Sequence, residues 1–259
     1  MNDEVGNSKR EDPLMVQSVA KAFRVLTVFD RGYGSLTLSQ ISQMTGMDLS
    51  TAQRFTHTLT QLGYLRKDPA SRQFELSVKT LDLAYHYTRA SRLVDRAMPI
   101  LLHLSTETEE AVSLTVLDGT EVVFLARYLS RRMLNTDVIT GSRLPAFCTS
   151  PGRAILSRMS DASVRDILAR SELKSYTSAT PIDVDDILAR IAEASRIGYA
   201  AAFDEIYLGD ASVAAPIIGA NGDVVAAVSI AVPLARMERS QFLETFPKLV
   251  TAAARGISF

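Results

Sequence analysis

Four hydrogen-bonding side chains recur at helical spacing early in the segment STAQRFTHTLTQLGYLRKDP, which begins at residue 50. On a helical wheel Ser50, Gln53 and His57 lie opposite an apolar side, and Arg54 lies at the flank. The apolar side consists of Ala52, Phe55, Leu59 and Leu62. Serine, glutamine, arginine and histidine can bond to base edges and phosphates, and no acidic residue stands among them. Because any surface helix also shows a polar back, this spacing alone leaves a solvated helix and a nucleic-acid-reading helix both open.

The other reactive side chain is Cys148, the single cysteine, which raises the alternative of an enzyme with a cysteine nucleophile. Such a nucleophile needs a base within hydrogen-bond reach and a third group that orients the base. His103 is the only histidine between residues 98 and 259, and Phe147 and Thr149 flank the thiol in a context where cysteine usually just packs. His57 likewise has no nucleophile or acid beside it. We therefore predict no catalytic residues.

Composition narrows the class of protein further. A length of 259 residues favours two domains, because one domain usually holds about 150 residues. One cysteine excludes an internal disulfide and a cysteine-rich zinc site and fits a reducing cytoplasm, and the three histidines have no ligand spacing. We therefore expect no metal, no other cofactor and a cytoplasmic location.

Neither a signal peptide nor a membrane span is predicted. Residues 1–13, MNDEVGNSKREDP, are polar without an apolar h-region and indicate a disordered arm. No uninterrupted apolar run approaches the ~18 residues that a membrane span needs.

With a net charge of -1, any affinity for nucleic acid must come from a local basic region. Between residues 14 and 76, seven basic residues stand against four acidic ones, a local excess of three.

Three helices are predicted before the first strands. The segment LMVQSVAKAFRVLTVFDRG gives one helix, which Gly32 can end. Its predicted buried face consists of Val19, Ala22, Phe23, Leu26 and Phe29. Thr37 followed by Gln40 is a capping-box pattern for a second helix, which Gly46 closes. The third helix, capped near Asp48, carries the polar side chains described above.

A basic hairpin follows the third helix. YLRKDPASRQFEL contains two short strand-like runs around Asp68 and Pro69. Such a wing can lie along a phosphate backbone while the preceding helix enters the major groove, so residues 14–76 predict a winged helix-turn-helix DNA-binding domain. A winged helix used only for protein contacts is the alternative, and the basic wing disfavours it. The predicted DNA-binding residues are Thr37, Ser50, Thr51, Gln53, Arg54, His57, Arg66, Lys67 and Arg72.

The second half has a different pattern. Residues 77–97 indicate a linker helix, and residues 98–259 alternate strand-like runs with helices. Two pairs of strand candidates are joined at Asp118-Gly119 and at Asn221-Gly222, which are hairpin turns. This pattern predicts an α+β domain with an antiparallel sheet.

Both halves resemble one family. VQSVAKAFRVLTVF and LTLSQISQMTGMDLSTAQRFTHTLTQLGYLRKDPASRQFELS are similar to the DNA-binding domain of IclR-type bacterial transcriptional regulators. GSRLPAFCTSPGRAILS and ASVAAPIIGANGDVVAAVSIAVP resemble the effector-binding domain of the same family, and the likeness extends from Leu14 to Ile257. It implies a winged helix, a linker helix and a GAF-like ligand domain. It also implies a dimer or dimer of dimers on a palindromic double-stranded operator, with the operon and the sign of regulation left open.

The resemblance also implies a small organic acid as effector. In GSRLPAFCTSPGRAIL, hydroxyl residues can cap a helix whose free amides would seat a carboxylate, although a well-capped helix explains the residues equally well. The implied effector residues are Phe147, Thr149, Ser150, Gly152, Asp204, Ser212 and Ser229, with Glu205 as an alternative to Asp204. Pro151 lacks an N–H, and Ala231 stands where some relatives carry a serine, so the effector is expected to be larger or less polar than the simplest acids.

One stretch points towards an aromatic acid. ARYLSRRML resembles the branch of the family that regulates aromatic-acid catabolism, where Arg127, Arg131 and Arg132 would serve the effector or the subunit interface. Ala211 departs from that branch, which usually carries an arginine there. The aromatic assignment therefore remains open at this point.

Overall fold

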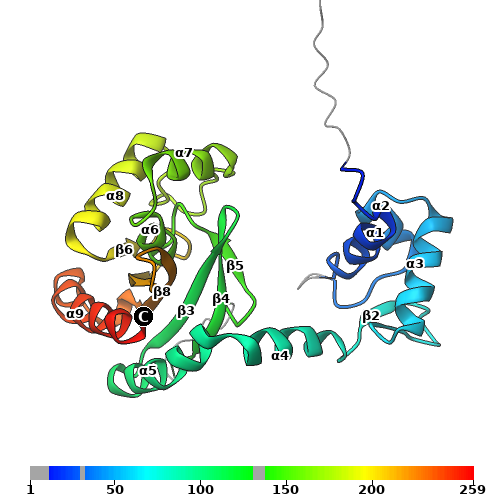
Figure 1. Ribbon diagram of the computed structural model, residues 1–259, viewed down its shortest axis with the longest axis horizontal. Coiled ribbons are helices and arrows are strands. Elements are labelled where there is room, and N and C mark those ends of the chain that lie inside the picture. Colours follow the sequence, from blue (N-terminus) through cyan, green and yellow to red (C-terminus); the bar gives the residue numbers. More distant parts are fainter. Residues whose placement is uncertain (1–11, 30–32, 131–137) are drawn as a thin grey trace, which may run out of the picture. The chain divides into compact units, whose positions relative to one another are not determined.

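The computed structural model describes residues 12–29, 33–130 and 138–259. The chain folds as two compact units, Met1–Tyr87 and Thr88–Phe259, which Figure 1 shows in blue to cyan and in green to red. Of the arm predicted over residues 1–13, residues 1–11 lie outside the described residues, as do Gly32, Arg131 and Arg132. Among the described residues, no helix is long and apolar enough to cross a membrane.

Up to residue 76, the described part of the first unit contains three helices and a two-stranded hairpin (Figure 1). These elements are α1 (Gln17–Leu26), α2 (Leu38–Thr45), α3 (Leu49–Gln61), β1 (Leu65–Lys67) and β2 (Phe74–Leu76). The predicted caps are confirmed: Thr37 and Gln40 form the capping box of α2, and Asp48 accepts the amide of Thr51 at the start of α3. Gly46 ends α2 at a φ of 67°, a conformation that costs a glycine little.

Two details of the predicted core are wrong. On α1 the fully buried residue is Val25, whereas Val19 and Phe23 are more than half exposed. Ala22, Leu26 and Phe29, also predicted on this face, are partly buried and pack against the core. The second error concerns α3, where the structure leaves Leu62 exposed at the C-cap.

In place of Leu62, Thr56 completes the buried side of α3. Burial of this polar side chain is compensated because its hydroxyl donates to the carbonyl of Ala52 at 2.9 Å. Thr56 therefore forms part of the buried core of the first unit although its side chain is polar.

The segment predicted as a single linker helix over residues 77–97 forms two helices instead. They are α4 (Thr80–Ala90) and the start of α5 (Arg92–Thr108). The break lies at Ser91, whose backbone leaves the helical region (φ −86°, ψ 103°) and whose side chain accepts the amide of Val94 at 3.3 Å. Serine competes for backbone groups in this way, and here it begins a new helix rather than continuing the old one.

The second unit is built on a six-stranded antiparallel sheet, as predicted. Its strands are β3 (Ala111–Asp118), β4 (Glu121–Tyr128), β5 (Arg143–Pro145), β6 (Ala200–Phe203), β7 (Asp210–Ile218) and β8 (Val224–Pro233). Their order across the sheet is β5-β4-β3-β8-β7-β6. Helices accompany them: α6 (Ser150–Leu156), α7 (Asp161–Arg170), α8 (Val184–Ile197), the short η1 (Leu234–Arg236) and α9 (Arg239–Ile257). The antiparallel order places β3 and β8, the central strands, next to each other.

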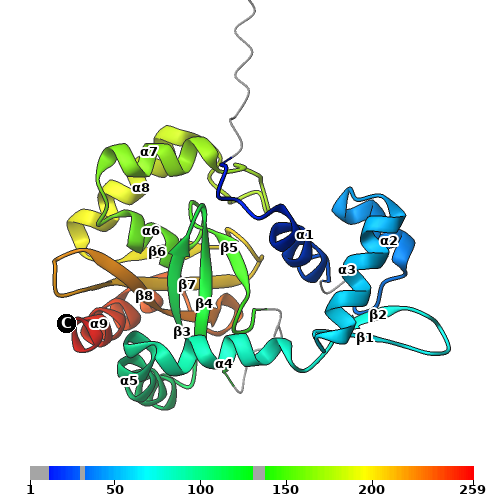
Figure 2. The same cartoon turned by 45° about the vertical axis from the view of Figure 1, so that its right-hand side comes forward.

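Helices cover both faces of this sheet (Figures 1 and 2). On one face α5 and α9 pack against Val213, Val228 and Ile230. On the other face α6, α7 and α8 cover Ala214 and Ala227. Side chains alternate between the two faces along a strand. The residues next in sequence to Val213, Val228 and Ile230 therefore point to the face that carries α6 and can reach a site there.

Candidate effector cavity and DNA-contacting helix

The polar face of α3 is open to solvent. The side chains of Gln53, Arg54 and His57 are exposed, and so is Ser50 near the start of the helix. Among the described residues, none of these four side chains is tied by a hydrogen bond or an ion pair. Below them Ala52 and other apolar residues anchor the helix in the core. A helix that is anchored in the core and exposes donors and acceptors without partners has the form expected of a helix that contacts base edges.

Two of the predicted DNA-binding residues serve as caps. Thr51 donates its hydroxyl and its amide to the carboxylate of Asp48, at 2.6 and 2.8 Å. Thr37 accepts the amide of Gln40 at 3.3 Å, and the Gln40 side chain accepts from Thr37 in return. Both hydroxyls therefore already make hydrogen bonds that cap helices. A contact with DNA would have to form in addition to these bonds.

The hairpin of β1 and β2 carries the three predicted wing residues. Arg66 forms an ion pair of 2.7 Å with Glu75 on the opposite strand, and Lys67 lies over the ring of Phe74. Arg72 lies in the turn with a left-handed φ of 59°, and its side chain has no hydrogen bond or ion pair among the described residues. Of the three, Arg72 is therefore the cation most available to a phosphate.

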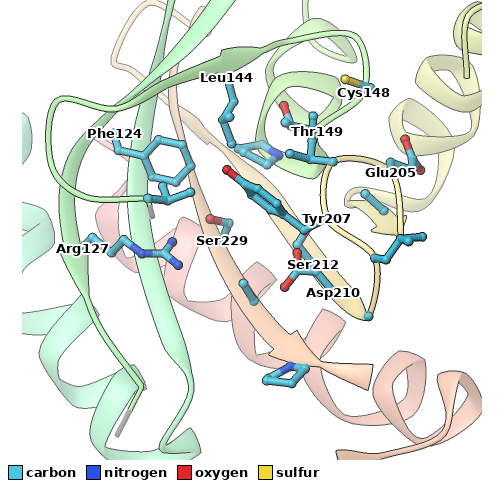
Figure 3. A pocket seen from close by; sticks show the side chains of 18 of the residues that line it. Phe124, Arg127, Leu144, Cys148, Thr149, Glu205, Tyr207, Asp210, Ser212 and Ser229 are labelled. Atoms are coloured by element: carbon cyan, nitrogen blue, oxygen red, sulfur yellow. The ribbon is translucent and has the colours of Figure 1, made fainter. Parts of the chain in front are cut away.

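The second unit contains a cavity of about 370 Å³, a size ordinary for small-molecule sites. Figure 3 shows its walls, which come from β4, the segment before α6, the loop that ends at β7, and β8. Residues from distant parts of the sequence meet here, on the face of the sheet that carries α6. Its lining includes Phe124, Arg127, Leu144, Thr149, Pro151, Glu205, Tyr207, Asp210, Ser212, Ser229, Ala231 and Arg236.

Three of the seven predicted effector residues line this cavity. They are Thr149, Ser212 and Ser229, which approach it from the start of α6, from β7 and from β8 (Figure 3). Ser150 is fully buried behind them and donates its hydroxyl to Ser212 at 2.9 Å. Ser150 therefore orients a cavity residue without itself forming the wall.

The other three lie away from the cavity wall. Phe147 is buried in the core under α6. Gly152 packs so tightly that a Cβ there would lie 2.1 Å from the carbonyl oxygen of Ala146, so its role is close packing. Asp204 accepts the amide of Gly209 and a guanidinium N–H of Arg239, each at 2.7 Å, and thus holds the loop before β7.

The amides at the start of α6 offer a smaller anion seat than the sequence suggests. Pro151 has no N–H, and the amide of Gly152 donates to the hydroxyl of Thr149 at 3.3 Å. A carboxylate in this cavity therefore needs another source of positive charge.

Among the described residues, Arg127 is a cation of the cavity wall that has no ion pair. It stands opposite Ser113 in the register of β4 and β3, and Ser113 stands opposite Ser229 on β8, so the three form a row across the sheet. Its guanidinium donates from Nη1 to Ser113 at 2.7 Å, while its buried Nε has no hydrogen-bond partner among the described residues. Burial lowers the pKa of Arg127, but an arginine stays protonated at neutral pH.

The cavity wall on the other side is fixed by a buried ion pair. Glu205 receives two guanidinium N–H groups of Arg153 at 2.6 and 2.8 Å, and Arg153 also donates to the carbonyl of Ala201 at 2.7 Å. Arg190 adds a contact of 3.4 Å from α8. The ion pair joins Arg153 on α6 to Glu205 in the loop that also carries Tyr207. Because breaking it would leave a buried charge without a partner, it holds α6 and this loop together.

The thiol of Cys148 does not suit nucleophilic catalysis. The residue is fully buried, and burial raises the pKa of its thiol to about 12, so that it remains protonated at neutral pH. His103 lies on α5 with its side chain largely exposed, beside Glu107 at 3.8 Å. No group of three or more potential metal ligands occurs in the part of the chain that the structure describes.

An open polar helix with a wing, in one chain with a domain that encloses a cavity, defines a ligand-responsive, DNA-binding transcriptional regulator. Residues 18–69 match the IclR helix-turn-helix domain, and residues 85–259 match the bacterial transcriptional regulator IclR C-terminal domain. The chain belongs to the IclR family of bacterial transcriptional regulators. Members of this family are regulators, so the alternative of an enzyme does not apply to this chain.

Individual relatives are similar to this chain over nearly its whole length. The Pca regulon regulatory protein of Pseudomonas putida is 34% identical over 247 residues, covering 95% of this chain and 84% of its own. The Pca operon regulatory protein of Acinetobacter baylyi is 30% identical, covering 93% and 88%. These relatives confirm that both units belong together in one protein.

Solved structures show the same fold. A transcriptional regulator of Rhodococcus sp. RHA1 aligns with a TM-score of 0.82 at 34% identity, covering 94% of this chain and 97% of its own. An IclR homologue from Microbacterium hydrocarbonoxydans, complexed with 4-hydroxybenzoate, aligns with a TM-score of 0.80 at 26% identity, covering 93% and 97%. The α+β architecture and the winged helix-turn-helix unit predicted from sequence are thereby confirmed.

Proposed function

We propose that this regulator senses a small aromatic carboxylic acid and controls an operon for the breakdown of such acids. Relatives support this assignment, because two are named Pca regulators and one solved homologue holds 4-hydroxybenzoate. The protein would act in the cytoplasm, on a palindromic operator contacted by α3 and the wing, with residues 14–76 as its DNA-binding domain. Residues 77–97 would link this domain to an effector domain of residues 98–259.

The observation that carries this proposal is the partly buried guanidinium of Arg127 close to apolar and aromatic residues of the cavity wall. Phe124 and Leu144 provide flat and apolar surface for a ring, while the hydroxyls of Ser212 and Ser229 offer hydrogen bonds (Figure 3). The cavity thus offers apolar surface for a ring beside a guanidinium and hydroxyls for a carboxylate. An aromatic ring with one carboxylate fits this division better than a short aliphatic acid, whose whole surface is polar.

The direct test is a calorimetric titration of the full chain with aromatic acids and with short aliphatic acids. We expect an aromatic acid such as 4-hydroxybenzoate to bind and to change the affinity for the operator, and pyruvate or glyoxylate to bind more weakly or not at all. Tighter binding of the aliphatic acids would contradict the aromatic assignment while leaving a carboxylate effector in place.

Substitution of Ser229 by alanine is expected to weaken effector binding. One neutral hydrogen bond contributes about 0.5–1.5 kcal/mol, so the dissociation constant should rise by roughly two- to twelvefold. Operator binding without effector should stay unchanged, and Ser240→Ala, at an exposed position on α9, serves as the control. If Ser229→Ala and Ser212→Ala both bind the acid as tightly as the wild type, the effector occupies a different site.

We further propose that the chain forms a dimer or a dimer of dimers and that α4 contributes to the interface. No residue of α4 is buried, and the side chains of Leu81 and Tyr85 are 63% and 61% exposed although both are largely apolar. Exposed apolar surface on this scale usually marks an interface, and a palindromic site requires a two-fold protein.

Sedimentation tests the role of α4. The wild type should sediment as a dimer or tetramer at micromolar concentration, and the double substitution Leu81→Glu/Tyr85→Glu should shift it towards smaller species. Asp82→Asn, on the same helix, should have no such effect. A wild type that is monomeric yet binds the operator with full affinity would rule the interface out.

A further inference from the structure

The cavity is lined by both positive and negative side chains, and most of them are already neutralised. Among the described residues the charged lining consists of Arg127, Glu205, Asp210 and Arg236. Glu205 is paired with Arg153 and, more distantly, with Arg190. Arg236 is paired with the buried Glu110. Two charges remain without an ion pair, one of each sign.

These two are Arg127 and Asp210. Arg127 bonds only to the neutral hydroxyl of Ser113. Asp210 begins β7, two residues before Ser212 and on the same face, and its side chain points into the cavity in Figure 3. Its carboxylate makes no hydrogen bond or ion pair with another described residue. The cavity thus holds one carboxylate whose role neither packing nor capping explains.

We propose that the effector carboxylate binds together with one proton, which Asp210 takes up. This inference rests on the proposed function, because it requires an anionic effector in this cavity. With Arg127 and Asp210 both charged, the unpaired charges of the described lining cancel, and an incoming carboxylate would leave a net negative charge in a partly buried site. A proton from solvent on the Asp210 carboxylate restores neutrality, and its new O–H can donate to the effector.

The surroundings of Asp210 favour this protonation. Burial raises the pKa of Asp210 to about 7, although the charge of Arg127 on β4 opposes the rise and that of Asp204 in the adjoining loop adds to it. Asp204 itself is held by Arg239 at 2.7 Å. Tyr207 from the same loop also lines this part of the cavity.

The remaining charges near the cavity are engaged elsewhere, Glu205 with Arg153 and Arg236 with Glu110. A bound carboxylate adds negative charge beside Asp210, and a like charge raises the pKa of an acid further. On this inference Asp210 is therefore partly protonated in the free protein near neutrality and protonated in the complex.

The direction of the pH dependence follows from linkage. Above pH 7 the free protein has lost the proton that the complex retains, so effector binding takes up a proton and affinity falls as pH rises. With a free pKa of about 7 and full protonation in the complex, the dissociation constant should rise about fivefold from pH 7 to 8, approaching tenfold per unit beyond. Below pH 6 the affinity should level off, because Asp210 is already protonated in the free protein.

The test is calorimetric titration of the full chain with 4-hydroxybenzoate between pH 6 and 8.5, in buffers of different ionisation enthalpy. The wild type should take up close to one proton per acid bound at pH 8. Asp210→Asn, which mimics the protonated carboxyl in shape, should bind with nearly constant affinity and without proton uptake. Asp223→Asn, at an exposed loop position, should retain the wild-type pH dependence.

The possible outcomes separate this inference from the proposed function. Binding that is independent of pH, without proton uptake, would overturn the role of Asp210 and leave the aromatic effector in place. Proton uptake that persists in Asp210→Asn would overturn it as well. If the acid does not bind to the wild type at any pH, the proposed function fails, and this inference fails with it. Should the variant fold poorly, the proton count of the wild type alone decides whether a proton accompanies the effector.

Discussion

Replacing Arg127 by glutamine is expected to remove most of the affinity of the effector domain for an aromatic acid. A hydrogen bond to a charged group contributes about 1.5–3 kcal/mol, so the dissociation constant should rise roughly ten- to hundredfold. Arg127 is the lining cation without a carboxylate partner among the described residues, and its Nε is buried without a hydrogen bond. The measurement is titration calorimetry with 4-hydroxybenzoate at pH 7.

Glutamine keeps hydrogen-bonding capacity and similar length, so that loss of binding reports on the charge. Arg165→Gln, on the exposed side of α7, is the matched control and should leave the affinity unchanged. Operator affinity without the acid should also be the same in both variants and in the wild type. If Arg127→Gln binds the acid within about twofold of the wild type, the carboxylate is bound elsewhere in the cavity.

The sequence was most informative where a single residue determines the local backbone. Thr37 and Asp48 each cap the helix predicted for them, and Gly46 ends its helix at a positive φ. These features depend on neighbours within four residues, and a hydroxyl or carboxylate near free amides has few alternatives. The beginnings of α2 and α3 were therefore predictable without tertiary information.

Burial on a short helix was harder to predict. Val25 is the buried residue of α1, although Phe23 offers more apolar area, because the contacting surfaces of α3 and α2 decide which side is covered. The break at Ser91 was missed for a related reason. The residues on both sides of it favour helix, and only the observed backbone shows that the serine caps a new one.

The cavity illustrates why a site is less predictable than the fold. Phe124 and Arg127 are three residues apart, so strict alternation would place them on opposite faces of β4. A bulge opposite Leu114 and Thr115 shifts the register by one residue and brings both side chains to the cavity. No residue in the sequence of β4 predicts this bulge, although the bulge brings the guanidinium of Arg127 to the cavity.

The hydroxyls of the cavity were predictable and its carboxylate was not. Ser212 and Ser229 were predicted from the family resemblance alone, and both line the cavity. Asp210 follows Gly209 in a stretch typical of a loop, where an aspartate usually serves a turn. Its backbone does bond within that turn, to Tyr207 and Asp204, but its side chain lines the cavity.

The DNA-binding unit supports the second prediction, which separates sequence-specific from non-specific contacts. Gln53 is expected to reach a base edge, since it is exposed early in α3 and its side chain is unengaged. A side chain that bonds to a base edge discriminates against the wrong base by about 1–3 kcal/mol. Gln53→Ala should therefore reduce the preference for the operator over scrambled DNA by roughly five- to hundredfold.

Arg72 should behave differently because it lies in the wing turn, where a phosphate contact carries no sequence information. Arg72→Ala should weaken binding to operator and scrambled DNA alike and reduce the salt dependence by about one phosphate contact. Arg54, at the flank of the polar face, is compatible with either kind of contact. Affinities for both DNAs across a salt series distinguish the two effects.

The matched controls lie in the effector domain, where α9 exposes Gln241 and Lys248. Gln241→Ala and Lys248→Ala remove the same kinds of side chain, a glutamine and a cation, without touching the winged helix. Neither should change operator preference or salt dependence. If Gln53→Ala and Arg72→Ala match these controls, then α3 and the wing do not contact DNA as assigned, and another surface of the first unit must bind the operator.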